Sequence, residues 1–294
     1  MRITDRMLHD RALGSLNTNV AALARIQEQV ASTKRLVRPS DDPADVRSAV
    51  KARDGLGEME QFLRNITTAQ RSVDASDTAL ASAGEAIQRA RELAVQGANG
   101  TLSASDRQTM ALEVEQLARQ LVTHAGAKAG DQYLFSGFQT GSAPYVEAPP
   151  GSAAVSAYGG DAGVVVARIA PGTTMTLNVT ADTVFQPALD ALAQMHAELV
   201  AGTPVSGGTI ALLDTGQSAL LAGRAQIGAR ANRLSEAQTT LEDNVLSARR
   251  LLSDLEDVDL AAAITELSQR MAVYQAALEV NAKIIQPSLL DHLR

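Results

Sequence analysis

Apolar residues recur at heptad spacing at both ends of this chain. Near the N-terminus, Leu13 and Val20 form one series, while Leu16, Leu23, Val30 and Val37 form a second. Near the C-terminus the pattern is repeated by Ile264, Leu267, Met271, Tyr274, Leu278 and Ile285, and Leu289 is assigned to the same surface. A stripe this narrow is typical of a coiled-coil helix, which needs another helix to cover it. We therefore expect the two ends to pair with each other and with neighbouring subunits, as in an assembly protein rather than an enzyme.

A turn is predicted directly after the first stripe. It comprises Pro39, Ser40, Asp41, Asp42 and Pro43. Pro39 disfavours helix in the residue before it, Asp42 is suited to cap a helix N-terminus, and Pro43 fits the first helical position. Asp41 and Asp42 resemble a catalytic carboxylate pair, but adjacent acids before a proline-started helix are typical capping and turn residues.

Two long helices are predicted between the ends. The first begins near residue 43 and ends near 99–100, and it carries Met59, Ile66, Val73, Leu80 and Ile87 at heptad spacing. The second follows residues 207–208, interpreted as a loop, and carries Leu220, Ile227, Leu234, Leu241 and Leu255. Shorter helices are expected from Ser103, with Asp106 at its third position, and from Pro187 to about residue 202.

Residues from about 140 to 186 differ in composition from the helices around them. They are rich in Gly, Pro and Ser, and the pair Pro171–Gly172 precedes a stretch in which Met175, Leu177 and Val179 alternate with polar residues. This alternation predicts a small β insert. The expected fold class is therefore mainly α. It comprises a terminal coiled-coil domain (1–38 plus 256–294), a long antiparallel helical rod (39–139 plus 187–255) and an outer β insert domain (140–186).

The two ends carry opposite charge. Residues 1–39 contain seven basic and three acidic side chains, whereas residues 254–294 contain seven acidic and three basic ones. The net charges of +4 and −4 would help the ends to associate, although each exposed ion pair contributes only about 0–1 kcal/mol. The alternative is that these are two solvated helix faces whose imbalance is accidental.

Composition and motifs argue against catalysis. Aromatic residues make up 3% of the chain, Cys and Trp are absent, and the net charge of −7 does not suit a general nucleic-acid binder. The four His lie far apart and have no metal-ligand spacing, so no metal, cofactor or catalytic residue is expected. No apolar run approaches the roughly 20 residues that span a bilayer, and residues 1–6 open no signal-peptide core, so any export is expected to need no cleaved signal.

Three stretches resemble the flagellin superfamily. They are the RPSDDPA sequence of residues 38–44, the NGTLS sequence of 99–103 with Asp106–Arg107, and the DVDLA sequence of 257–261 with Ala263–Ile264. The YLFSGFQT sequence of 133–140, the ensuing 143–145, the start MRIT and the ending SLLDHL of 288–293 resemble its hook–filament junction subfamily. Thr33 and Pro287 depart from the family, which usually has Gly and an apolar residue there.

The resemblance implies an extracellular structural subunit of the bacterial flagellum that contributes to motility. Members are exported unfolded through the flagellar type III apparatus, after binding a FlgN-like chaperone. They form a ring of about eleven subunits between a FlgK-type junction protein and the flagellin filament, a tubular arrangement that needs heterologous interfaces. The terminal helices line the inner tube and the insert faces outward.

Two alternatives are open. The chain resembles flagellin itself, which forms the filament, although residues 133–138 and the C-terminal sequence argue for the junction subfamily. A helical signalling or receptor module is the more distant alternative, and that class usually needs a membrane span. A gene adjacent to one for a FlgK-type protein would discriminate between the first two.

Overall fold

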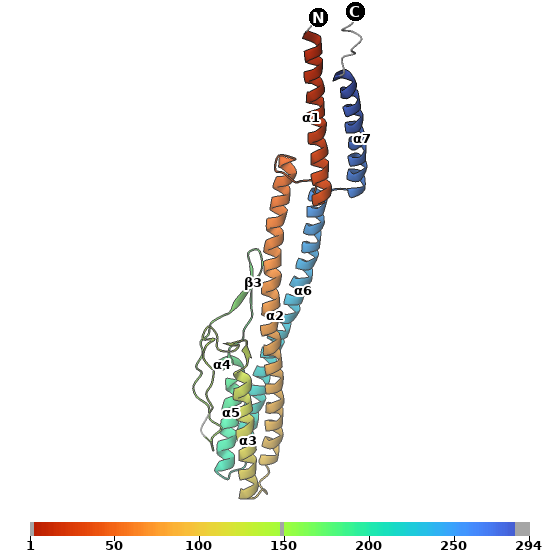
Figure 1. The fold of residues 1–294 in the computed structure, drawn as a ribbon. Helices are drawn as coiled ribbons and strands as arrows, with labels where there is room; N and C mark the ends of the chain where they lie inside the picture. Colours follow the sequence, from red (N-terminus) through yellow and green to blue (C-terminus); the bar gives the residue numbers. More distant parts are fainter. Residues whose placement is uncertain (1–2, 148–149, 286–294) are drawn as a thin grey trace, which may run out of the picture. The chain divides into compact units, whose positions relative to one another are not determined.

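The computed structural model describes residues 3–147 and 150–285. Its elements follow in the order α1 (Ile3–Ser32), α2 (Pro43–Gly97), α3 (Ala104–Ala125), β1 (Lys128–Ala129), β2 (Gln132–Tyr133), β3 (Val166–Ala170), β4 (Thr173–Thr176), α4 (Ala181–Val184), α5 (Gln186–Val200), α6 (Gly207–Glu256) and α7 (Leu260–Ile285) (Figure 1). The predicted fold class, mainly α with a small amount of antiparallel β-structure, is confirmed. Pro287 and Leu289 lie outside the described residues, as does the side chain of Ile285.

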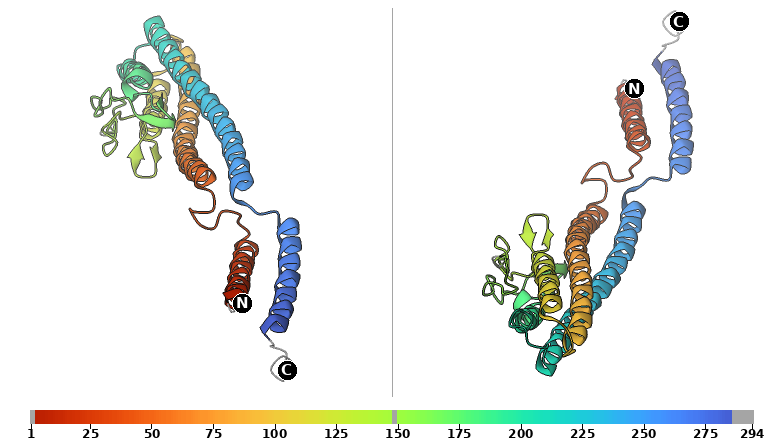
Figure 2. Two further views of the ribbon diagram at one scale, coloured as in Figure 1. Left: turned by 90° about the horizontal axis from the view of Figure 1, so that it is seen from above. Right: turned by 90° about the horizontal axis from the view of Figure 1, so that it is seen from below.

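Packing divides the chain into two compact units. The terminal unit comprises Met1–Glu58 and Asn244–Arg294, and the central unit comprises Met59–Asp243. Within the terminal unit, α1 and α7 run antiparallel and pack side by side (Figures 1 and 2). Two short crossovers, residues 33–42 and 257–259, connect these helices to the start of α2 and the end of α6.

Helix starts follow the capping chemistry that the sequence predicts. The carboxylate of Asp42 accepts hydrogen bonds from the backbone N–H groups of Ala44 (3.0 Å) and Asp45 (3.1 Å), so α2 begins at Pro43. At α3, Ser103 accepts from the backbone N–H of Asp106 (3.1 Å) and the Asp106 side chain accepts in return, which completes a capping box. These bonds satisfy backbone donors that the first helical turn leaves without partners.

The start of α6 differs from the prediction. Residues 207 and 208, expected in a loop, are the first two residues of the helix. The Ser206 hydroxyl accepts from the backbone N–H of Thr209 (3.2 Å), and the Glu198 carboxylate accepts from the backbone N–H of Ser206 (2.9 Å). Because this cap precedes both glycines, the helix can begin despite their low helix propensity.

One hydrophobic core joins α2, α3, α5 and α6 in the central unit. The predicted seam residues that are buried there are Ile66, Val73, Leu80 and Ile87 on α2 and Leu220, Ile227, Leu234 and Leu241 on α6. Helices α5 and α6 approach closely at Gly216, where a Cβ would lie 2.6 Å from the Cα of Ala188. A larger residue at this position would therefore force the two helices apart.

The predicted insert contains one hairpin and shares the core of the helices. Strands β3 and β4 pair antiparallel around a turn in which Gly172 has φ +69°. Strand β4 ends at Thr176 rather than reaching Val179, because the Asn178 side chain bonds to Val165 N–H (2.8 Å) and the Gly163 carbonyl (2.9 Å) instead. The buried insert residues Tyr145, Ile169, Met175 and Phe185 belong to the same core cluster as the helices. The short β1–β2 hairpin was not anticipated from the sequence.

Candidate assembly interface

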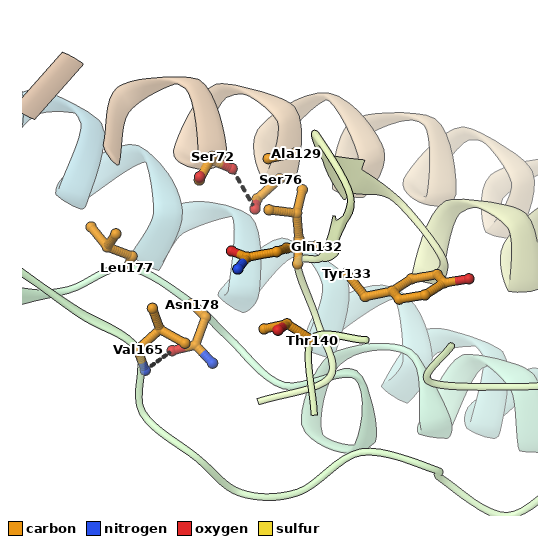
Figure 3. Close-up of a pocket in the computed structure, with 10 residues that line it drawn as sticks. Ser72, Ser76, Ala129, Gln132, Tyr133, Thr140, Val165, Leu177 and Asn178 are labelled. Carbon is orange, nitrogen blue, oxygen red and sulfur yellow. Dashed lines mark hydrogen bonds between the residues drawn. The ribbon is translucent and has the colours of Figure 1, made fainter. Parts of the chain in front are cut away.

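The described part of the chain contains no cluster of metal-ligating side chains. No group of three His, Cys, Asp or Glu side chains in it could hold a metal ion, and none of its helices is long and apolar enough to cross a membrane. A cavity of about 60 Å³ in the central unit is lined both by polar side chains, such as Ser76 and Asn178, and by apolar ones, such as Val165 and Leu177 (Figure 3). This volume suits a few water molecules and lies well below the ~300 Å³ typical of a substrate pocket.

The terminal helices bury one seam between them. On α1, Leu16, Leu23 and Val30 are half-buried, and on α7 so are Leu267 and Tyr274. Two further residues of this seam were missed in the sequence: Ile26 is 5% exposed and Ala263 is 7% exposed. Ile26 follows Leu23 by three positions, which is the spacing between the two core positions of a heptad. This spacing is the signal from which Ile26 could have been predicted.

The other predicted interface residues remain outside that seam. Five of them lie beside it, and we call these five residues the exposed flanks. On α1 they are Leu13 (48% exposed) and Val20 (41%), and on α7 they are Ile264 (51%), Met271 (45%) and Leu278 (42%). The flanks run beside the buried seam, so a single chain leaves two apolar stripes in contact with water. Repeated exposure of large apolar side chains on one surface is typical of a surface that binds another molecule.

Val37 does not continue the α1 stripe. Helix α1 ends at Ser32, and Thr33 has a left-handed backbone with φ +59°. Val37 therefore lies in the crossover, where it is half-buried and donates its backbone N–H to Asp41 (3.2 Å). The heptad prediction is wrong at this residue, because spacing alone does not report where the helix ends.

The two crossovers pair through a single β-bridge between Lys34 and Asp257. The backbone N–H of Arg35 donates to the Glu256 carbonyl (2.6 Å), and the backbone N–H of Val258 donates to the Thr33 carbonyl (3.1 Å). The incoming and outgoing segments of the terminal unit are thus tied together at the residues where all four helices begin or end.

Ion pairs surround this bridge. The Glu256 side chain is 4% exposed and lies between Lys34 Nζ (3.4 Å) and Arg53 Nη2 (2.7 Å). Its Oε1 contacts Arg53 as an ion pair without the alignment of a hydrogen bond. Arg35 pairs with Asp45 and also donates to the Leu255 carbonyl (2.8 Å). Part of the opposite charge expected at the two ends therefore meets here, where Lys34 contacts Glu256 and Asp257.

The pairing between Lys34 and Asp257 shifts the pKa of both side chains. Their hydrogen bond of 2.5 Å raises the pKa of Lys34, and the same bond, with help from Ser253, lowers the pKa of Asp257. The stability that the charged Asp257 contributes to the folded state is therefore lost only as pH falls through its lowered pKa. The stability that the charged Lys34 contributes is lost only as pH rises through its raised pKa. Both groups remain charged and paired at neutral pH.

The acidic pair of the turn motif has a structural role. Asp41 accepts from the backbone N–H of Arg38 (2.8 Å), which is the main cause of its lowered pKa, and its carboxylate lies 3.2 Å from Arg25. Asp42 caps α2, and the bond from the Asp45 backbone lowers its pKa in turn. Both carboxylates are held charged by turn and cap contacts, so neither is suited to general acid catalysis.

The aromatic motif of residues 133–138 has both buried and exposed members. Phe135 is fully buried and packs edge-on against Phe185, with ring centroids 5.0 Å apart. Gly137 has φ +67°, and the next residue, Phe138, is 66% exposed. The Asp161 carboxylate accepts from the backbone N–H of Phe138 (2.7 Å), which holds the turn.

Gly137→Ala is expected to lower the free energy of unfolding of the central unit by about 2–4 kcal/mol. A Cβ would overlap the carboxylate and carbonyl oxygens of Asp161, and the left-handed backbone is strained for alanine. Gly130→Ala is the control, because Gly130 has φ +62° but open space around it. Urea unfolding should show a loss of only about 1 kcal/mol there. Equal losses in the two variants would contradict the role assigned to Asp161.

Two family models match the chain. The bacterial flagellin N-terminal helical region matches residues 3–140, and the bacterial flagellin C-terminal helical region matches residues 210–293. Flagellar hook-associated protein 3 of Salmonella typhimurium is 27% identical over 306 residues, which cover 94% of this chain and 95% of that protein. A flagellin of Listeria monocytogenes is 24% identical over 295 residues, covering 100% and 99%.

A solved structure shows the same fold. FlgL of Bacillus cereus superposes with a TM-score of 0.61 at 18% identity, over 69% of this chain and 99% of that one. The matched family consists of structural subunits, which confirms the expectation that the chain is not an enzyme. The two flagellin models together cover both terminal helices, both long helices and the turn motif, and on this basis the chain belongs to the flagellin superfamily.

Proposed function

We propose that this protein is a hook-associated junction subunit of the bacterial flagellum, which joins the hook, through a FlgK-type junction protein, to the flagellin filament. The observation that carries the proposal is the pair of exposed flanks, which a single chain cannot cover. Burial of apolar surface contributes about 25 cal/mol per Å², so copies that cover these flanks are stabilised by association. The match to hook-associated protein 3 over nearly the whole chain supports this assignment.

In this proposal the chain has three functional parts. Residues 1–38 plus 256–294 form the inner tube, residues 39–139 plus 187–255 form the surrounding rod, and residues 140–186 face outward. About eleven copies form a ring with heterologous contacts between neighbours. The assembly residues are those of the buried seam and the exposed flanks, together with Ile285 and Leu289 on the C-terminal stripe and Val37 in the crossover.

The proposal also includes the route to the assembly. The chain is exported without a cleaved signal peptide through the flagellar type III apparatus and functions outside the cell. Before export, a FlgN-like chaperone covers the C-terminal stripe. The apolar exposure of Met271 and Leu278 supports this step, because such side chains favour an apolar partner in either setting.

Flagellin is the second candidate, because the Listeria flagellin also matches over the whole chain. Gene deletion separates the two functions. In the bacterium that encodes this chain, loss of its gene is expected to leave hooks without filaments and flagellin free in the medium, and re-expression should restore swimming. Overproduction in cells that lack flagellin is expected to give no long filament. Filaments built from this chain alone, seen by electron microscopy, would establish the flagellin alternative.

A further inference from the structure

A strained backbone lies at the crossover of the terminal unit. Among the residues that the structure describes, Thr33 is the one non-glycine residue with positive φ, at +59°. The left-handed region is unfavourable for a β-branched side chain, whereas glycine adopts it readily. The Thr33 hydroxyl bonds only to the adjacent Ser32 carbonyl (2.7 Å), which does not itself require the left-handed backbone. Strain of this kind persists where surrounding contacts impose it.

The contacts that impose it converge on Thr33 and the two residues after it. The Thr33 carbonyl accepts from Val258, the Arg35 N–H donates to Glu256, and Gln29 Nε2 donates to the Arg35 carbonyl (3.0 Å). The buried carboxylate of Glu256 binds Lys34 from one crossover and Arg53 from α2. The bridge and the ion pairs therefore favour the closed crossover, while the backbone of Thr33 opposes it.

We propose that residues 33–35 and 256–258 form a strained latch, whose closure holds α1 and α7 in register and whose opening relaxes Thr33. Because both crossovers belong to one bridge, opening frees the two terminal helices together. The latch is a property of the single chain and goes beyond the proposed junction function. It sets how readily the terminal helices separate, and glycine at position 33 would make it close more firmly.

Hydrogen exchange at the backbone amides of Arg35 and Val258 measures the open fraction, because these two N–H groups form the bridge. Thr33→Gly is expected to slow exchange at both amides about fivefold, since it removes the strain. Thr33→Ala removes the β-branch and the hydroxyl but keeps a Cβ, so it is expected to slow exchange by less than Thr33→Gly does. Glu256→Gln is expected to speed exchange at both amides about threefold to tenfold, because Lys34 and Arg53 both lose the carboxylate that links the crossover to α2.

Two controls make the result specific. Glu266→Gln removes an exposed pair with Arg270 (2.8 Å) on α7 and should leave both amides at the parent rate. The amide of Leu192 on α5 reports the central unit and should be unchanged in every variant. If these two amides exchange as fast in Thr33→Gly as in the parent, the latch does not exist. The same conclusion holds if one substitution changes the exchange rates of Arg35 and Val258 by different factors.

A disulfide tests the bridge directly. Lys34 and Asp257 face each other as a non-hydrogen-bonded antiparallel pair, a geometry in which Cα atoms lie about 4.5 Å apart and disulfides form. The chain has no cysteine of its own, so Lys34→Cys with Asp257→Cys can form only this intramolecular bond. Oxidation is expected to close it without denaturant and to suppress exchange at Arg35 and Val258, with recovery on reduction. Failure to cross-link under these conditions would overturn the proposal.

Discussion

Met271→Asp combined with Leu278→Asp is expected to abolish filament growth while the isolated chain stays folded. Both side chains are exposed on α7, so the carboxylates remain hydrated in the monomer. In an assembly that covers this flank, each would lose its water without gaining a partner, which costs several kcal/mol. Filament counts by electron microscopy should fall to the level of the gene deletion, and the circular dichroism of the purified variant should match that of the parent.

Thr265→Asp combined with Ala272→Asp is the matched control. These residues are also exposed, are separated by the same heptad interval on α7, and introduce the same charge. Their spacing places them on the side of the helix away from α1 and from the exposed flanks. Cells with this variant should still grow filaments. If both pairs abolish growth equally, added negative charge near the C-terminus, rather than the flank itself, explains the loss.

Phe185→Ala is expected to lower the free energy of unfolding of the central unit by about 3–5 kcal/mol. The ring is fully buried and packs edge-on against Phe135, so truncation removes apolar burial, leaves a cavity and breaks an aromatic pair. The midpoint of urea unfolding should fall accordingly.

Phe138→Ala provides the same chemical change on the surface. Because that ring is largely exposed, the expected change in unfolding free energy is within about 0.5 kcal/mol. Phe185 belongs to the segment predicted as an outer insert. A large loss of unfolding free energy in Phe185→Ala would therefore also show that this segment stabilises the helices. Equal effects of the two substitutions would contradict the shared core.

Local chemistry made several boundaries predictable. Asp42 and Ser103 cap their helices with side-chain bonds that span two or three residues, so the sequence itself contains both partners. The seam of the long helices was predictable for a related reason. On each long helix the regularly spaced apolar residues form one stripe, so only one face of the helix can point into the core.

The terminal helices did not offer a single choice. Leu13 and Leu16 begin two apolar series on neighbouring faces of α1, and the structure leaves the first exposed while it buries Ile26 beside the second. The sequence therefore predicted an apolar surface on each terminal helix, but not which half of that surface a single chain covers. Val37 was misplaced for a similar reason, because α1 ends before a left-handed Thr33, whose carbonyl accepts from Val258 near the other end of the chain.

The bridge between Lys34 and Asp257 also has a consequence for synthesis on the ribosome. Its two residues are 223 positions apart, whereas the Glu198–Thr209 bond that starts α6 spans 11. At about 5–20 residues per second, roughly 10–45 s separate the translation of these two residues. Closing so large a loop also costs more entropy than forming the local contacts. Throughout that interval α7 is not there to cover the apolar seam of α1, so the seam side chains are available to any molecule that reaches them before α7 does.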